Sequence, residues 1–167
     1  MTGRAIPAEF TTGAVSVSLP REGPLGHQRT IQRAVTCEGI GIHTGAEVRV
    51  TLRPAPANSG ILFRRMDLPA HPAVPAAPQF IEDVHYATTL ARNGVRVKTV
   101  EHLMAAFAGV GLDNVVVELT GPEVPAMDGS ALPFVGLLRR AGLRRILRRR
   151  VWGNIRLILG TPGGPAQ

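Results

Sequence analysis

The chain has 167 residues, which is enough to bury one core, and its 44% hydrophobic content is typical of a globular protein. The formal net charge is +7, but residues 1–138 hold 11 Lys and Arg against 12 Asp and Glu, a net of 11 − 12 = −1. Residues 139–167 hold eight Arg and no acid, so the excess charge belongs to a tail and argues against a nucleic-acid-binding body.

The sequence also excludes several cellular contexts. No apolar run is long enough to cross a bilayer, and the N-terminus lacks the apolar stretch of a secretory signal. Cys37 is the only cysteine, so an internal disulfide framework is excluded and a reducing compartment is favoured. We therefore expect a cytoplasmic protein.

The first half of the chain predicts strands and loops. Residues 1–27 show no sustained period and are expected to form a mobile extension. Strands are predicted at 30–37, 46–53 and 61–65, the second of which alternates apolar and polar residues. Four prolines within 69–78 predict an extended loop.

The middle of the chain predicts a hairpin followed by a helix. Asn93-Gly94, between strands at 84–91 and 95–98, is typical of a type I′ turn. Thr99 is the expected N-cap of the helix, and Gly109 or Gly111 is its expected end. The apolar stripe of this helix is predicted to comprise Val100, Leu103, Met104 and Phe107.

A short apolar strand at 115–119 and a second helix, from about Ser130 through Leu138, are predicted next. The order of elements favours the α+β class: a small, mostly antiparallel sheet with two helices packed on one face.

The pair Glu101–His102, in the first turn of the predicted helix, is the strongest candidate for chemistry. A carboxylate beside an imidazole is the minimal pairing for zinc-assisted hydrolysis, and the positive end of a helix favours a carboxylate and a neutral imidazole. The alternative is a surface acid and a partly exposed histidine. Spacing alone favours this alternative, because metal sites need several converging ligands.

Other candidates are weaker. His43 lies in the glycine-rich turn 39–45, where the backbone can approach a ligand, but a surface histidine in a tight connection is the simpler interpretation. Thr88 and Thr89 could donate hydrogen bonds to a substrate, although threonine in a strand usually reflects β-propensity alone.

Four blocks then identify a resemblance: G-I-G-I-H-T-G, R-P-A-P-A-N-S-G, T-V-E-H and M-D-G-S-A. In this order and spacing, residues 28–138 resemble the UDP-3-O-acyl-N-acetylglucosamine deacetylases, the zinc hydrolases of lipid A biosynthesis in Gram-negative bacteria. The resemblance implies a two-domain, monomeric enzyme with Zn²⁺ between its domains, which removes the N-acetyl group from UDP-3-O-acyl-N-acetylglucosamine. The matched region would be the first of these domains.

The resemblance also implies roles for individual residues. Glu101 would be the general base, and His102 would be one of three protein ligands to zinc. His43 would contact substrate or support the site. Thr88 and Thr89, named above for their hydroxyls, are expected in the same kind of role.

The sequence departs from the family after the second predicted helix. The family continues into a second domain with an H-K-x-x-x-D block and a further histidine, whereas no histidine follows His102 here. For residues 139–167 we favour a frameshift or truncation over a genuine tail, and we expect an incomplete enzyme. The alternative is a basic amphipathic helix built on Leu143, Ile146, Leu147 and Val151, in a non-catalytic module that contacts a membrane surface or a sugar nucleotide.

Overall fold

The computed structural model describes residues 26–149, and within them the α+β prediction is confirmed. A five-stranded sheet in the order β2-β3-β9-β4-β5 forms the centre of the fold. Its strands are β2 (Val35–Ile40), β3 (Glu47–Pro54), β4 (Ile61–Arg65), β5 (Ala73–Pro75) and β9 (Val115–Leu119). The pairing of β4 with β9 is parallel, and the other pairs in this sheet are antiparallel.

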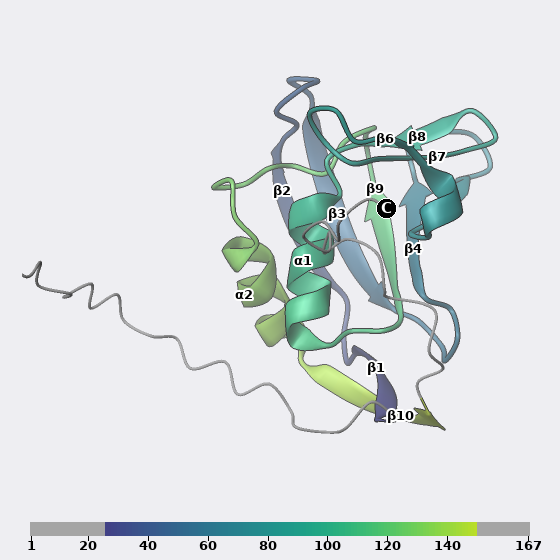
Figure 1. Cartoon of the computed structure of the whole chain (residues 1–167). Coiled ribbons are helices and arrows are strands. Elements are labelled where there is room, and N and C mark those ends of the chain that lie inside the picture. Colours follow the sequence, from purple (N-terminus) through teal and green to yellow (C-terminus); the bar gives the residue numbers. More distant parts are fainter. Residues whose placement is uncertain (1–25, 150–167) are drawn as a thin grey trace, which may run out of the picture.

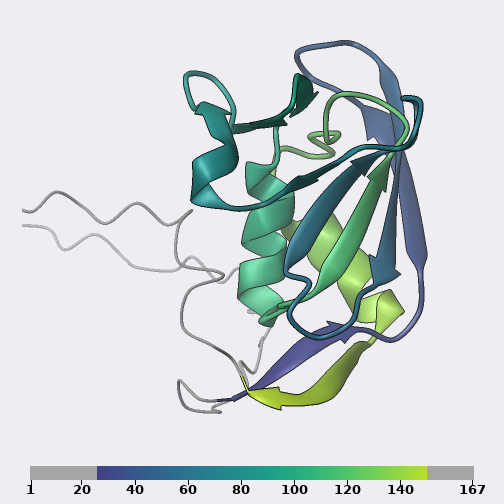
Figure 2. The same ribbon diagram turned by 90° about the vertical axis from the view of Figure 1, so that its right-hand side faces the viewer.

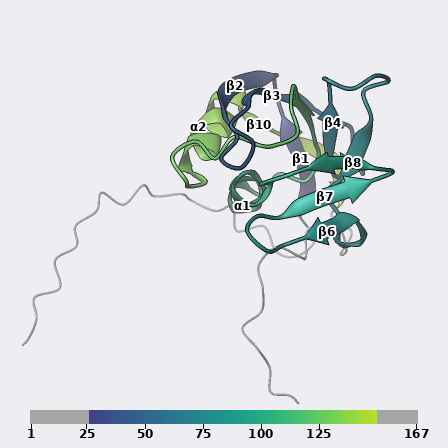
Figure 3. The ribbon, with the colours of Figure 1, turned by 90° about the horizontal axis from the view of Figure 1, so that it is seen from above.

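Two helices, α1 (Glu101–Val110) and α2 (Leu132–Ala141), pack beside each other on one face of this sheet (Figures 1 and 2). A second sheet, in the order β6-β7-β8, lies near the first turn of α1 (Figure 3). Its strands are β6 (Ile81–Asp83), β7 (Thr89–Arg92) and β8 (Val95–Val97), and the short 3₁₀ helix η1 (Pro78–Phe80) precedes β6. None of the described helices is long and apolar enough to span a bilayer.

The core lies between the helices and the five-stranded sheet. Phe63 of β4, Phe107 of α1 and Phe134 of α2 are its largest apolar side chains, and all three are fully buried. The alternation predicted for 46–53 is confirmed, because Val48, Val50 and Leu52 are buried between exposed or half-buried neighbours. Burial of each such side chain contributes about 1.5–3 kcal/mol, so the core fixes how α1 sits on the sheet.

The predicted hairpin is confirmed around Asn93-Gly94, but its first strand is shorter than expected. Asn93 and Gly94 both have positive φ, 51° and 78°, as a type I′ turn requires. β7 begins at Thr89 instead of residue 84. Part of the proline-rich loop, β5, pairs with β4, which is possible because β5 is an edge strand.

The strand predicted at 30–37 is wrong as a single element. The structure divides it into β1 (His27–Ile31) and β2, because the chain turns at residues 32–34 and leaves one sheet for another. Apart from His27, which begins β1, and Gly26, the extension predicted at 1–27 lies outside the described residues.

The amphipathic helix considered for the tail is also wrong for the residues that the structure describes. α2 ends at Ala141, and Leu143–Arg149 forms strand β10, which pairs antiparallel with β1. Gly142, with a φ of 69°, stops the helix, and the backbone N–H of Gln32 donates to its carbonyl. A helix would also have placed arginines four positions apart on one face, where like charges repel. Val151, the last residue of the proposed apolar face, lies outside the described residues.

Candidate active site

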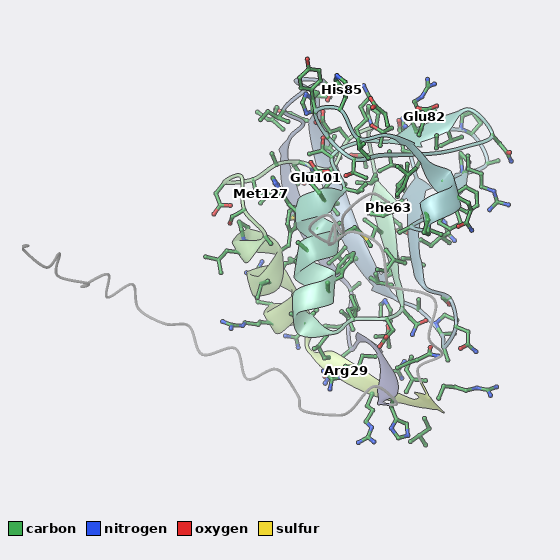
Figure 4. The ribbon with its side chains drawn as sticks, in the orientation of Figure 1. Arg29, Phe63, Glu82, His85, Glu101 and Met127 are labelled. Atoms are coloured by element: carbon green, nitrogen blue, oxygen red, sulfur yellow. The ribbon has the colours of Figure 1, made fainter. Side chains whose placement is uncertain are left out.

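Glu101 and His102 lie in the first turn of α1, as the sequence predicted. Figure 4 labels Glu101 at this end of the helix. Both side chains are half-buried. The backbone N–H of Thr88 donates to Oε2 of Glu101 at 2.9 Å, which fixes the orientation of the carboxylate. Glu101 Oε1 accepts no hydrogen bond from the described residues, so one oxygen of an oriented carboxylate stays available for a proton.

His102 carries a buried polar atom that nothing in the described structure satisfies. Its Nδ1 is shielded from solvent and has no hydrogen-bond partner among residues 26–149. Leaving such an atom unpaired costs about 1–3 kcal/mol, so this unpaired ring nitrogen indicates a place where a ligand is expected. The apolar stripe of α1 is confirmed on the opposite side, with Leu103, Met104 and Phe107 buried.

The prediction that Thr99 caps this helix is wrong. The N-cap residue is Val100, which makes no side-chain cap bond. Thr99 adopts a left-handed backbone conformation with φ 58°, and its hydroxyl donates instead to Oε1 of Glu123 at 2.7 Å. The hydroxyl of Thr99 donates to an ionised carboxylate, and such a charge-assisted hydrogen bond is stronger than the neutral one that a capping hydroxyl accepts from a backbone N–H. The side chain therefore points towards Glu123.

Glu123 is the residue of this region that sequence reasoning missed. Its side chain is fully buried, and its two oxygens accept hydrogen bonds from the backbone N–H groups of His43 and Thr44 and from the hydroxyls of Thr44 and Thr99. Burial raises the pKa of this carboxyl, but the hydrogen bonds outweigh burial and hold its pKa below the ordinary value of 4.5. All four groups donate to the carboxylate, so the site favours the ionised form.

A signal for Glu123 was present in the sequence. It is the one acid in the stretch Gly121-Pro-Glu-Val-Pro125, which directly follows a buried strand and is enclosed by prolines. An acid placed there must either face solvent or find several donors. Three of the four donor groups come from His43 and Thr44, about 80 positions earlier in the chain, and the fourth from Thr99, 24 positions earlier, so no local pattern could have named them.

His43 lies on the connection between β2 and β3, as its glycine-rich sequence suggested. Its side chain is exposed, whereas its backbone N–H is bound to Glu123. Gly41 makes this packing possible, because a Cβ at that position would lie 2.4 Å from Oε2 of Glu123 and 2.4 Å from Oγ1 of Thr44. The backbone of this loop is therefore fixed while its imidazole faces outward.

The structure brings some of the predicted site residues together and separates others. Thr88 meets Glu101 through its backbone, as described above. Thr89 is 6% exposed at the start of β7, so its side chain is largely inaccessible to a substrate in this structure. His43 is joined to the start of α1 indirectly, through Glu123 and Thr99.

The described residues fit a metal only in part. His102 offers an imidazole with an unpaired nitrogen, and Glu101 beside it offers a carboxylate. Within residues 26–149, however, no group of three His, Cys, Asp or Glu side chains is placed to hold a metal ion. This part of the chain therefore offers one imidazole and one carboxylate, whereas a tetrahedral metal site needs further ligands.

Comparisons with known proteins support the resemblance that the four sequence motifs indicated. Residues 28–157 match the family model described as UDP-3-O-acyl N-acetylglycosamine deacetylase. The UDP-3-O-acyl-N-acetylglucosamine deacetylase of Myxococcus xanthus (strain DK1622) is 55% identical over 118 residues, which cover 71% of this chain and 38% of that protein.

Two further relatives carry the same name. The protein of Xylella fastidiosa (strain Temecula1 / ATCC 700964) is 49% identical over 119 residues, covering 71% of this chain and 39% of the relative. That of Chromobacterium violaceum is 51% identical over 117 residues, covering 70% and 38%. The chain thus matches less than two fifths of the length of these relatives.

Proposed function

The chain belongs to the UDP-3-O-acyl N-acetylglycosamine deacetylase family, and from this premise we propose that it supplies the base and one zinc ligand of a lipid A deacetylase. The substrate would be UDP-3-O-acyl-N-acetylglucosamine, which the relatives' names specify, and the reaction would remove its N-acetyl group. The observation that carries this proposal is the buried, unpartnered Nδ1 of His102, in the residue that follows Glu101 and its oriented carboxylate.

Each of the two residues has a distinct task in this proposal. Glu101, held at Oε2 by Thr88, accepts the proton of the attacking water at its other oxygen. His102 is one protein ligand, and its position in the first turn of α1 keeps it next to the base. Zinc, when bound, supplies a Lewis acid that polarises the amide carbonyl and acidifies water.

The described part of the chain is expected to be insufficient for turnover. Three protein ligands are usual for a catalytic zinc, and the described residues place no such group. Exposed apolar side chains lie on the loops around the site, including Ile42, at 68% exposed, and Met127, at 41%. These support the proposal that a further part of the enzyme would cover this end of the domain.

A zinc titration of the isotope-labelled full chain tests the role of His102 without relying on activity. We expect the His102 imidazole resonances to shift or broaden first, and this response to vanish in His102→Ala. His85→Ala is the matched control, because His85 is exposed and should leave the His102 response intact. Equal perturbation of the exposed histidines, or no response at His102, would refute the assignment.

Acetate release from UDP-3-O-acyl-N-acetylglucosamine tests the second half of the proposal. The purified chain should retain little zinc after dialysis and should show negligible turnover, because its described residues supply too few ligands. Stoichiometric zinc together with turnover that Glu101→Ala abolishes would show that the chain is catalytically complete and would overturn this expectation.

A further inference from the structure

Three segments that are distant in the sequence meet at the carboxylate of Glu123. One is the loop 41–45, which carries His43; another is the connection from β8 into α1, which contains Thr99 and leads directly to Glu101 and His102. The third is the segment that carries Glu123 itself, after β9. A single buried side chain therefore lies between two groups of candidate site residues.

The backbone around Glu123 is bound to the connection that enters α1. The N–H of Lys98 donates to the carbonyl of Pro122 at 2.9 Å, and the N–H of Val124 donates to the carbonyl of Lys98 at 3.0 Å. The hydroxyl of Thr99 adds a third contact, at 2.7 Å to Glu123 Oε1. Glu123 is thus fixed to the entrance of α1 by main chain on both sides and by its own side chain.

From this fixed position the carboxylate reaches the loop that carries His43. Oε2 accepts from the N–H of Thr44 at 2.9 Å and from its hydroxyl at 2.7 Å, and the N–H of His43 lies 3.1 and 3.2 Å from the two oxygens. Gly41 contributes by lacking a Cβ where the carboxylate passes. A second pair of bonds, Gly41 N–H to Ala46 and Gly45 N–H to Gly41, closes the loop on itself.

We propose that Glu123 is a positioning residue, whose carboxylate holds the His43 loop in register with the first turn of α1. The inference rests on the proposed function, since it treats Glu101 and His102 as the reacting pair. The inference adds Glu123, which makes no direct hydrogen bond to Glu101 or to His102. Loss of this carboxylate would let the loop and the helix entrance move independently.

Substitutions on the two sides of the Glu123 carboxylate distinguish a positioning role from a general contribution to the stability of the fold. Thr99→Val removes the hydroxyl on the helix side, and Thr44→Val removes the hydroxyl on the loop side, each with little change in shape. We expect Thr99→Val to shift the amide signals of His43 and Thr44, and Thr44→Val to shift the imidazole signals of His102. Thr99→Ser should restore the wild-type spectrum, because it keeps the donor.

Amide hydrogen exchange gives the second measurement. In Glu123→Gln, exchange at His43 and Thr44 should accelerate by about tenfold or more, because a neutral amide offers one acceptor oxygen to four donors. Exchange at Val50, in the centre of β3, reports global opening and should change less. Thr36→Val, which removes an exposed hydroxyl contact between β2 and β3, is the matched control and should change neither region.

The outcomes separate this inference from the proposed function. The inference is wrong if Thr99→Val leaves the amide signals of His43 and Thr44 unchanged and Thr44→Val leaves the imidazole signals of His102 unchanged. It is also wrong if amide exchange in Glu123→Gln rises equally at Val50 and at the His43 loop, because Glu123 would then be a structural residue only. The zinc response of His102 would then still stand. If the cross-perturbation is observed but zinc does not act at His102, the positioning network is real and the proposed chemistry is wrong.

Discussion

Replacing Gly41 with alanine tests the packing on which the site depends. The added Cβ would lie 2.4 Å from Oε2 of Glu123, 2.4 Å from Oγ1 of Thr44 and 2.9 Å from Cδ of Glu123. Contacts under 3.0 Å are essentially absent from real structures, so the neighbours must move. Both neighbours are held by hydrogen bonds to each other, and neither can move without breaking them.

The size of the effect follows from the displacement required. An ordinary contact begins near 3.4 Å, so Oε2 must retreat by about 1 Å, which is 3.4 − 2.4. A movement of this size away from Thr44 would take Oε2 out of hydrogen-bond range, since the two bonds to Thr44 are 2.7 and 2.9 Å long. Overpacking costs about 1–3 kcal/mol, and a lost bond to a charged group costs about 1.5–3 kcal/mol. We expect Gly41→Ala to lower the free energy of unfolding by about 3 kcal/mol.

Urea denaturation followed by far-ultraviolet circular dichroism measures this change, with the melting temperature falling by roughly 10 °C. Gly109→Ala is the control: a Cβ there meets nothing within 4 Å, and alanine is favoured over glycine in a helix by about 0.5–1 kcal/mol. The two substitutions add the same methyl group and should have opposite signs. A Gly41→Ala protein as stable as the wild type would refute the tight packing around Glu123.

Two further predictions concern the carboxylate and the core. Because the folded-state pKa of Glu123 is lowered, its stabilising contribution is complete above the ordinary glutamate pKa of 4.5 and is lost as pH falls through the lower folded-state value. The urea midpoint of the wild type should therefore fall more steeply on acidification to pH 3 than that of Glu123→Gln, and parallel curves would contradict the assignment. Phe107→Ala removes a fully buried ring between α1 and the sheet and should destabilise the protein by about 3–5 kcal/mol in the same assay, whereas Ala108→Ser, at an exposed position of α1, should change stability by less than about 0.5 kcal/mol.

Much of the local structure followed from the sequence, because the determining interactions lie within a few residues of each other. The alternation in 46–53 predicted β3, and the stripe of Leu103, Met104 and Phe107 predicted the buried face of α1. Asn93-Gly94 predicted the hairpin turn, since few residue pairs adopt two consecutive positive φ angles. The pair Glu101–His102 was also identified, from chemistry and from the blocks around it.

Elements whose secondary structure depends on pairing with a distant segment of the chain were predicted less well. Residues 143–149 carry a pattern compatible with a basic helix, and they form β10 because Gly142 ends α2 and β1 offers an edge to pair with. Residues 30–37 look continuous but divide between two sheets for the same reason. Strand pairing is a long-range contact, and neither segment contains its partner.

The sequence by itself determined the family, the helical position of Glu101 and His102, and the face that α1 buries, because these depend on residue identity and short-range periodicity. Only the tertiary structure showed that Thr99 binds Glu123 and does not cap the helix, and that the His43 loop is fixed by the same carboxylate. A buried charge must collect donors from wherever the fold brings them, and here they come from two segments that lie far apart in the sequence.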